Sequence, residues 1–201
     1  MKKVLPIAIC GILSACGGTT VVDLNNEQEV QQMQNVMELE YRDWEKTAGD
    51  MTTSMLQSGA FSKVKNPVIA VANIKNDTMQ RFDTDILVKK IRSTILKSGQ
   101  AQISTNFTGE DSTSNAVRGT RSNAEYDASS IVSKGTLVAP NLSLSGKMLQ
   151  RNLKLQSGWF SSVDTRVGYY LQLTLTDLKT GLSVWEDEEP IVKEGDHAPT
   201  W

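Results

Sequence analysis

The sequence predicts an α+β domain in which helices pack on a mixed β-sheet, preceded by a tether and a long amphipathic helix. Residues 67–106 read as a buried strand, a helix and a second strand. Strands with alternating apolar and polar residues fill the last third of the chain. Between residues 28 and 58, apolar residues recur every three or four positions, which is typical of an amphipathic helix. An α/β segment followed by consecutive strands indicates the α+β class.

The composition excludes several broad classes of protein. The 201 residues are 39% hydrophobic, which is enough for one domain with a buried core rather than a chain that is disordered throughout. Twenty-one basic and 23 acidic residues give a formal net charge of −2, which argues against a dedicated nucleic-acid-binding protein. One histidine and two cysteines leave almost no ligands for a transition-metal site.

The first sixteen residues predict a processed and acylated N-terminus. A positive head, Met1-Lys2-Lys3, precedes an apolar run over residues 4–12 that is too short to span a bilayer. The run ends in Leu13-Ser14-Ala15-Cys16, which resembles the lipobox of bacterial lipoproteins. We therefore expect a signal peptide over residues 1–15 and acyl chains on the Cys16 thiol. The alternative is an ordinary secretory signal with a chance cysteine.

The predicted acylation fixes where we expect the protein to reside. Acyl chains bury methylene groups at about 0.8 kcal/mol each, so several chains anchor the protein durably in a membrane. Lipoproteins kept at the inner membrane commonly carry Asp after the acylated cysteine, and here Gly17 follows Cys16. By that resemblance we expect an outer-membrane protein that faces the periplasm. Because Cys10 leaves with the signal peptide, the remaining chain has no thiol for a disulfide.

A flexible tether over residues 16–27 leads into the helix predicted over residues 28–58. The apolar stripe of this helix has near-heptad spacing and consists of Val30, Met33, Met37, Tyr41, Trp44, Ala48, Met51 and Met55. Ser58-Gly59 gives the helix a typical end. Two interpretations stay open: the stripe packs on its own domain, or it contacts a partner as a coiled coil or a helix in a groove.

The globular domain is predicted over residues 60–195 and begins with a strand at 67–73. Asp83 or Thr84 can cap the helix that follows, and Lys97-Ser98-Gly99 ends it. A second strand follows at residues 100–106. Residues 108–123 form a long polar stretch, which favours a functional or locally disordered loop. A helical piece is predicted after this loop, at residues 124–134.

The last third of the sequence predicts an antiparallel sheet. Leu142, Leu144 and Met148 lie at even-numbered positions, whereas Leu153 lies at an odd-numbered one. This change of parity would move the apolar side chains to the other face of the strand, so it predicts a β-bulge near Leu149-Gln150. The next strand keeps one parity throughout, with apolar side chains at Val163, Val167, Tyr169, Leu171, Leu173 and Leu175. Asp177 opens a turn that Gly181 closes, which is a strong hairpin signal.

Three segments resemble the LpoB family: Val-Ile-Ala-Val-Ala-Asn-Ile-Lys-Asn-Asp-Thr at residues 68–78, the hairpin at 168–181, and Trp-Glu-Asp-Glu at 185–188. With the lipobox, the resemblance covers about residues 48–195. It implies a TolB-N-like α/β fold and an outer-membrane lipoprotein without catalysis or cofactor. Such a protein docks onto a class A penicillin-binding protein, a peptidoglycan synthase, and stimulates it. Unlike the best-known members, this chain has only five prolines and no Pro-rich linker.

The sequence contains little that indicates an enzyme active site. His197 stands alone in the predicted tail at residues 196–201, and no nucleophile can be paired with it. The acidic run Glu186-Asp187-Glu188-Glu189 is predicted to be solvated charge after a strand, although paired carboxylates can cleave glycans. No phosphate-binding glycine loop follows a strand, so we expect no small-molecule substrate.

Two features are predicted to contact a protein partner. Trp159 and Phe160 are adjacent aromatics in an expected hairpin loop, where strand packing cannot easily bury both. Arg118 and Arg121 in the polar stretch can meet an acidic patch. Together the observations predict an outer-membrane activator of a peptidoglycan synthase that binds no nucleic acid. The alternative is a structural or assembly lipoprotein of another envelope machine that uses the same fold.

Overall fold

The computed structural model describes residues 39–108, 111–154 and 165–195. Several predictions lie outside the described residues and stay predictions: the signal peptide 1–15 with its acylated Cys16, the tether 16–27, residues 28–38 of the amphipathic helix, the loop with Trp159 and Phe160, and the tail with His197.

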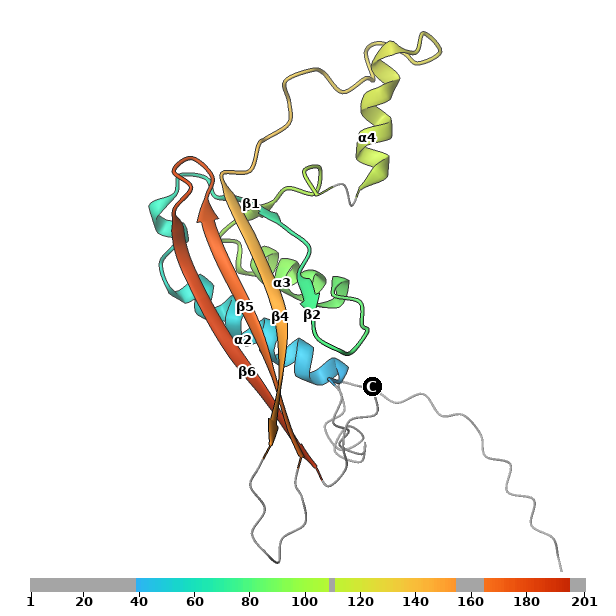
Figure 1. Ribbon diagram of the computed structural model, residues 1–201. Coiled ribbons are helices and arrows are strands. Elements are labelled where there is room, and N and C mark those ends of the chain that lie inside the picture. Colours follow the sequence, from blue (N-terminus) through green and yellow to red (C-terminus); the bar gives the residue numbers. More distant parts are fainter. Residues whose placement is uncertain (1–38, 109–110, 155–164, 196–201) are drawn as a thin grey trace, which may run out of the picture. The chain divides into compact units, whose positions relative to one another are not determined.

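A six-stranded mixed sheet forms the centre of the domain (Figure 1). Its strands are β1 (Val68–Val71), β2 (Lys75–Asp77), β3 (Gln102–Ile103), β4 (Leu142–Lys154), β5 (Thr165–Asp177) and β6 (Ser183–Gly195). The order across the sheet is β3-β1-β4-β5-β6, and β2 also pairs with β4. β1 runs parallel to β3 and β4, and β2 runs parallel to β4. β4, β5 and β6 are antiparallel neighbours, so the predicted α+β class with a mixed sheet is confirmed.

Two helices, α2 (Tyr41–Gln57) and α3 (Asp85–Ser98), lie against one face of this sheet (Figure 1). The core between the layers combines the apolar stripes of both helices with alternate residues of the strands. Its fully buried side chains include Met51, Met55, Ile69, Leu87, Ile91, Ile95, Leu142, Leu144, Met148, Tyr169, Leu171 and Leu173. The single parity predicted for residues 167–175 is confirmed, because all five odd-numbered side chains are buried.

α2 begins at Tyr41 after Glu40 in an extended conformation, so the prediction of one unbroken helix over residues 28–58 is wrong. The stripe of α2 packs on its own domain, which is the first of the two interpretations left open by the sequence. Trp44, Ala48, Met51 and Met55 are buried, while Tyr41 at the start of the helix is 43% exposed. The Trp44 ring also contacts Phe82, with ring centroids 4.0 Å apart. This part of the helix therefore belongs to the folded domain rather than to a free stalk.

Polar contacts fasten α2 to the edge strand β6. Lys193 Nζ lies 2.6 Å from Asp43 Oδ2, and the two side chains are only 14% and 21% exposed. The same Asp43 oxygen accepts a hydrogen bond from the Glu40 backbone N–H and so also caps the helix. Farther along the helix, Ser54 Oγ donates to Asp187 Oδ2. The acidic run at 186–189 thus lies within β6, and the prediction that it follows the end of a strand was wrong.

α3 begins and ends where the sequence predicts. Thr84 is the N-cap residue, although its side chain makes no capping hydrogen bond. Instead, Asp83 Oδ1 accepts a hydrogen bond from the Asp85 backbone N–H. Gly99 ends the helix with a φ of 68°, a left-handed conformation that glycine adopts at little cost.

The predicted β-bulge near Leu149-Gln150 is wrong. β4 pairs with β5 without a register shift from Leu142↔Asp177 to Lys154↔Thr165. Because β5 alternates without interruption, a bulge in β4 would break the match between the apolar sides of the two strands. The register shift of this sheet lies instead between Leu175 and Thr176, in the pairing of β5 with β6.

Local hydrogen bonds explain two further differences. The stretch at 108–123 contains a short helix, α4 (Ser112–Gly119), and a 3-10 turn at Thr120–Ser122, because Asp111 Oδ1 caps α4 by accepting from the Ser114 N–H. The helix predicted at 124–134 is wrong, since this segment forms turns. There Asp127 Oδ1 accepts from the Ser129 N–H, which competes with helix formation and lowers the pKa of Asp127.

The hairpin between β5 and β6 is confirmed. Asp177 Oδ1 accepts a hydrogen bond from the Lys179 N–H at 2.7 Å, and the Asp177 carbonyl accepts from the Gly181 N–H at 2.8 Å. Gly181 has a φ of 72°, so this turn needs a residue that tolerates the left-handed region.

Asn141 ties the start of β4 to the segment that leads into β1, and its loss should destabilise the domain. Its Oδ1 accepts from the Val68 N–H at 2.8 Å, and its Nδ2 donates to the carbonyls of Asn66 and Lys65. We predict that Asn141→Ala lowers the free energy of unfolding by about 1–3 kcal/mol, because it leaves backbone groups without partners. Urea unfolding followed by circular dichroism measures the change.

Asn115→Ala on the exposed surface of α4 is the matched control for Asn141→Ala. It should change the free energy of unfolding by less than about 0.5 kcal/mol. Equal effects of the two substitutions would contradict the role assigned to Asn141.

Candidate functional site

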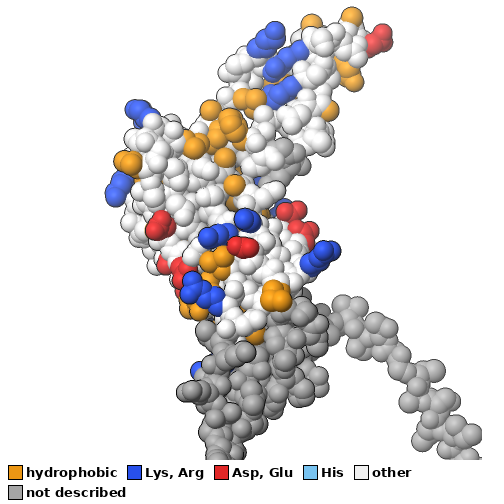
Figure 2. All heavy atoms as spheres, in the orientation of Figure 1, with side chains coloured by type: hydrophobic (Ala, Val, Ile, Leu, Met, Phe, Trp, Pro, Cys, Tyr) orange, Lys and Arg blue, Asp and Glu red, His pale blue; other side chains and the backbone are white. Residues whose placement is uncertain are grey.

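The face of the sheet opposite α2 and α3 is the candidate partner-binding surface. Alternate residues of a strand point to opposite faces. On β4, Leu144 and Met148 are buried under the helices, whereas Ser145 and Lys147 are exposed on the other side. In Figure 1 the strands β4, β5 and β6 pass in front of α2, so Figure 2, in the same orientation, shows this uncovered face. Basic, acidic and hydrophobic side chains lie next to one another over its middle.

The middle of the uncovered face is apolar. Leu149 on β4 lies directly opposite Tyr170 on β5, and Tyr170 lies opposite Pro190 on β6. Leu149 and Tyr170 are half-buried by their neighbours in the sheet, while Pro190 is exposed. Val192, the next residue of this face on β6, is 54% exposed. These four side chains form one continuous patch across three strands.

Tyr170 is held flat along β5 by the glycine beside it. A Cβ atom at Gly168 would lie 3.1 Å from Tyr170 Cε2 and from its hydroxyl oxygen, so the ring occupies the space that a side chain at 168 would fill. Arg151 lies directly opposite Gly168 on β4, and its guanidinium carbon is 5.7 Å from the centre of the Tyr170 ring. The arginine and the ring together cover Gly168, which is buried.

Positive charge lies on the β2–β4 side of the patch. Lys75 on β2 lies directly opposite Lys147 on β4, and both are exposed. Within the described residues, neither lysine forms an ion pair or a side-chain hydrogen bond. Like charges in directly opposed positions destabilise a strand pair. Arg151 extends the positive charge along β4. The exposed Asp77 on β2 lies opposite Leu149 and places a carboxylate on the same side.

Negative charge lies on the β6 side of the same face. Glu186 and Glu188 are exposed, at positions opposite Thr174 and Gln172 on β5. Glu188 accepts a hydrogen bond from the Gln172 side-chain amide. The uncovered face thus carries an apolar middle between a side with three basic residues and Asp77 and an acidic side on β6.

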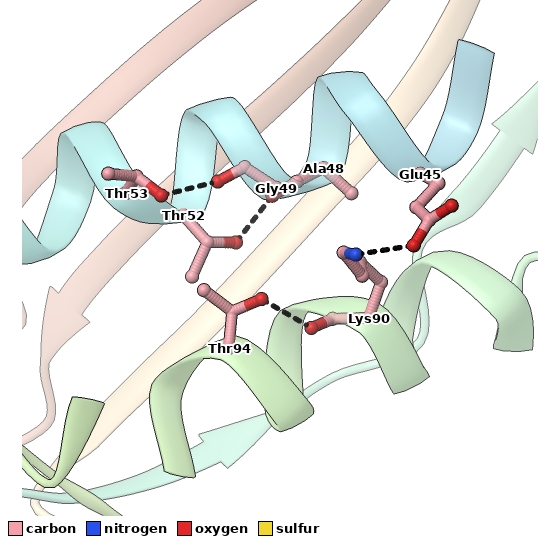
Figure 3. Close-up of polar contacts among 7 residues, drawn as sticks. All are labelled: Glu45, Ala48, Gly49, Thr52, Thr53, Lys90 and Thr94. Atoms are coloured by element: carbon pink, nitrogen blue, oxygen red, sulfur yellow. Dashed lines mark hydrogen bonds and ion pairs between the residues drawn. The ribbon is translucent and has the colours of Figure 1, made fainter. Parts of the chain in front are cut away.

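A second concave region lies along α2 and α3, and it carries charges of both signs. The groove holds about 950 Å³ and is lined by residues that include Tyr41, Glu45, Ile86, Lys90, Arg92 and Asp111. Lys90 Nζ lies 2.6 Å from Glu45 Oε1, an ion pair between the two helices (Figure 3). A Cβ at Gly49 would lie 3.5 Å from Lys90 Cε, an ordinary van der Waals contact, so the lysine stem packs close to this glycine.

The hydroxyl groups beside this ion pair are used within their own helices. Thr52 Oγ1 donates to the Ala48 carbonyl, Thr53 Oγ1 to the Gly49 carbonyl, and Thr94 Oγ1 to the Lys90 carbonyl (Figure 3). They are therefore bound to the backbone rather than directed at a ligand. This arrangement favours a structural contact between α2 and α3 over a binding site.

The described residues offer no metal centre and no membrane-spanning helix. Within residues 39–108, 111–154 and 165–195, no three His, Cys, Asp or Glu side chains are grouped so that they can hold a metal ion. None of the helices in the same ranges combines the length and the apolar character needed to cross a membrane.

The structure places both arginines of the predicted partner site outside the sheet. Arg118 lies on α4, and its Nε and Nη1 atoms are shielded from solvent without a hydrogen-bond partner. Arg121 Nε donates to the Val132 carbonyl at 2.8 Å and its Nη2 to the Ser133 carbonyl at 2.7 Å. Arg121 therefore closes the loop at 121–133. The other predicted contacts, Trp159 and Phe160, lie outside the described residues.

Sequence reasoning missed the residues that distinguish the uncovered face, Lys75, Lys147, Arg151 and Tyr170. The parity of β4 and β5 contained part of the signal, since Lys147, Leu149 and Arg151 alternate with buried positions. The pairing of β2 with β4 was not foreseen, and only this pairing brings Lys75 beside Lys147.

Comparison with known families covers almost the whole described domain. The sequence model of the family described as "Peptidoglycan-synthase activator LpoB" matches residues 43–191. The chain belongs to this family. The resemblance to the LpoB family that was seen in residues 48–195 is thereby confirmed. The matched range includes most of α2, β1 to β5, and β6 up to Ile191. No curated protein sequence matches the chain.

Solved structures of LpoB proteins are similar to this chain at low identity. The "LpoB C-terminal domain from Escherichia coli" is 12% identical with a TM-score of 0.43, and covers 74% of this chain and 98% of that one. The corresponding domain from Salmonella enterica is 17% identical with the same TM-score and the same two coverages. The nuclear magnetic resonance structure of Escherichia coli LpoB is 15% identical with a TM-score of 0.42, and covers 97% and 94% of the two chains.

The role of Arg121 leads to a test of loop closure. We predict that Arg121→Ala speeds chymotrypsin cleavage after Tyr126, which is 53% exposed, because the loop loses two hydrogen bonds to its backbone. The free energy of unfolding of the domain should change by less than about 0.5 kcal/mol, because no residue of α4 is buried. Cleavage rates and urea midpoints measure the two effects.

Lys134→Ala, an exposed basic residue next to the same loop, is the control for Arg121→Ala. It should leave the cleavage rate unchanged. A large loss of global stability in Arg121→Ala would show that this segment supports the core instead.

Proposed function

We propose that this member of the LpoB family is an outer-membrane lipoprotein that binds a class A penicillin-binding protein and activates it from the periplasmic side. The observation that carries the proposal is the family match over residues 43–191, a range that contains α3, most of α2 and the sheet up to Ile191 in β6. The family is one of peptidoglycan-synthase activators. The class A identity of the synthase and the membrane anchor at Cys16 are proposals that go beyond the family match.

A regulatory, non-catalytic role agrees with how the described acidic residues are used. Asp187 accepts from Ser54 and Glu188 accepts from Gln172, so these carboxylates support the sheet and its contact with α2. An activator acts by binding one state of its partner more tightly than another, and for this it needs a surface rather than a reactive group. The uncovered face of the sheet supplies such a surface.

The proposed anchor at Cys16 sets a limit on the reach of the domain. Since Leu39 is buried in the core and hydrogen-bonded to Gln80, only residues 17–38 can separate the acyl chains from the folded part. These residues span at most about 80 Å when fully extended, at 3.3–3.6 Å each. Residues 41–57 are packed on the domain and add no length as a free helical stalk. The tether alone therefore has to span the distance to the synthase.

Activation is tested with the acylated full-length chain and a purified class A penicillin-binding protein from the same envelope. We expect the chain to co-purify with the synthase and to raise its rate of glycan polymerisation, because binding to the active state shifts the synthase toward it. The chain alone should release no soluble muropeptides from purified peptidoglycan.

Two results would contradict the proposed function. An unchanged polymerisation rate, together with co-purification of other envelope proteins, would favour the assembly lipoprotein. Release of muropeptides by the chain alone would identify a glycan-cleaving enzyme.

The anchor is tested with Cys16→Ala. We expect this variant to be lost from the outer-membrane fraction, because it loses the sulfur that carries the acyl chains. Its melting temperature should not change, since the described core is formed by residues from Leu39 onward. Membrane fractionation and intact-mass spectrometry measure the two properties, and Ser14→Ala, which keeps a small residue before the cysteine, is the control. Retention of Cys16→Ala in the outer membrane would reject the lipobox.

A further inference from the structure

The opposed lysines on the uncovered face are the feature of the described surface that most clearly indicates a binding site. Lys75 and Lys147 occupy directly opposed positions on neighbouring parallel strands. Both are exposed, and no carboxylate of the described residues lies within ion-pair distance of either ammonium group. Two exposed ammonium groups in opposed positions without an ion-pair partner attract an anionic group. A carboxylate placed between them would make a favourable charge contact with both.

The neighbours of the lysine pair fit an apolar anchor. Leu149 is the next residue after Lys147 on the same face of β4, and it lies opposite Tyr170 on β5. Arg151 follows and lies over the Tyr170 ring. Tyrosine and arginine are the residue types that most often dominate the binding energy of protein interfaces, and the ring here is already fixed over Gly168. A rigid aromatic side chain loses little conformational entropy when a partner binds.

We infer that the uncovered face docks a segment of the partner protein that presents carboxylates beside an apolar side chain. The carboxylates lie against Lys75, Lys147 and Arg151, and the apolar side chain lies on Leu149 and Tyr170. The inference rests on the proposed function, since it assigns this segment to the peptidoglycan synthase. We call these five residues the lysine–tyrosine surface.

The charge distribution favours a protein over a membrane or a polyanion as the occupant. Glu186 and Glu188 are exposed on the β6 side of the same face. A uniformly anionic lipid surface or glycan that covered the lysines would also approach these carboxylates and be repelled. A protein segment can place acidic groups against the lysines and basic or neutral groups against the glutamates.

The α2–α3 groove fits such a segment less well, because it carries carboxylates of its own. Lys90 is paired with Glu45 across the groove. Arg92 also has an interaction partner. Lys89 and Lys97 are exposed, but Asp85 and Asp111 line the same groove. An incoming carboxylate would compete with Glu45 for Lys90 and would approach these two aspartates. At the lysine pair, neither ammonium group has an ion-pair partner among the described residues.

Charge reversal of a single lysine separates binding from stability. In Lys147→Glu, the new carboxylate lies opposite Lys75 and replaces a like-charge pair by an opposite-charge pair. We expect its melting temperature to equal or exceed that of the wild-type chain. Its Kd for the synthase should rise about tenfold or more, because a favourable charge contact becomes a repulsive one. Lys75→Glu should behave in the same way, and Lys147→Arg should keep wild-type affinity.

The measurement uses the acylated full-length chain in detergent and the purified synthase, with Kd determined by biolayer interferometry at two salt concentrations. Lys65→Glu, which makes the same charge change at an exposed position away from this face, is the matched control. It should leave Kd unchanged. The wild-type Kd should rise with salt, and the Lys147→Glu variant should lose part of that dependence.

The outcomes separate this inference from the proposed function. If the wild-type chain activates the synthase and both glutamate variants bind it with unchanged Kd, the docking inference is overturned and the proposed function stands. If the wild-type chain neither binds nor activates the synthase, both fail. If the variants lose binding to phosphatidylglycerol vesicles or to purified peptidoglycan but keep their affinity for the synthase, the face binds an anionic surface and the inference of a protein occupant is overturned.

Discussion

The unbroken register between β4 and β5 is the constraint on which the rest of the structure depends. The two strands pair from Leu142↔Asp177 to Lys154↔Thr165 without a shift. Because side chains alternate between the faces, this register sends Tyr169 and Leu171 under the helices and leaves Tyr170 on the opposite face. A slip of one residue would exchange the two faces along the whole pair. The core and the candidate surface are therefore consequences of the same pairing.

The covered face explains why α2 belongs to the domain. Met51 and Met55 are buried against the sheet, and the Asp43–Lys193 ion pair fixes the start of the helix to β6. Gln80 adds a second attachment, since its side-chain amide donates to the Leu39 carbonyl and accepts from the Leu39 N–H. The Asn76-Asp77-Thr78 segment noted in the sequence holds Gln80 in place, because Asn76 Nδ2 and Thr78 Oγ1 both donate to the Gln80 carbonyl. That motif therefore fixes the point at which the preceding chain enters the domain.

The sequence predicted the features that local chemistry determines. The parity of residues 167–175, the left-handed glycines 99 and 181, and the acidic start of α3 follow from side-chain periodicity and backbone conformation alone. It did not predict the pairing of β2 with β4, because Lys75 and Lys147 are brought together by the tertiary fold and not by a short turn. The predicted bulge was wrong because it was read from β4 alone, without the register that β4 forms with β5. The predicted helix at 124–134 was wrong because the hydrogen bond from the Ser129 N–H to Asp127 favours a turn there. The candidate site was incomplete for the same reason, since it is formed by neighbours across strands.

The central claim, that the uncovered face rather than the helical face meets the synthase, is tested most directly by photo-crosslinking in the complex. Val192 on the uncovered face and Leu96 on α3 are matched in exposure, at 54% and 55%. A photoreactive amino acid at position 192 should form a crosslink to the synthase upon irradiation, and the same group at position 96 should form none. A crosslink from position 96 without one from position 192 would contradict the account.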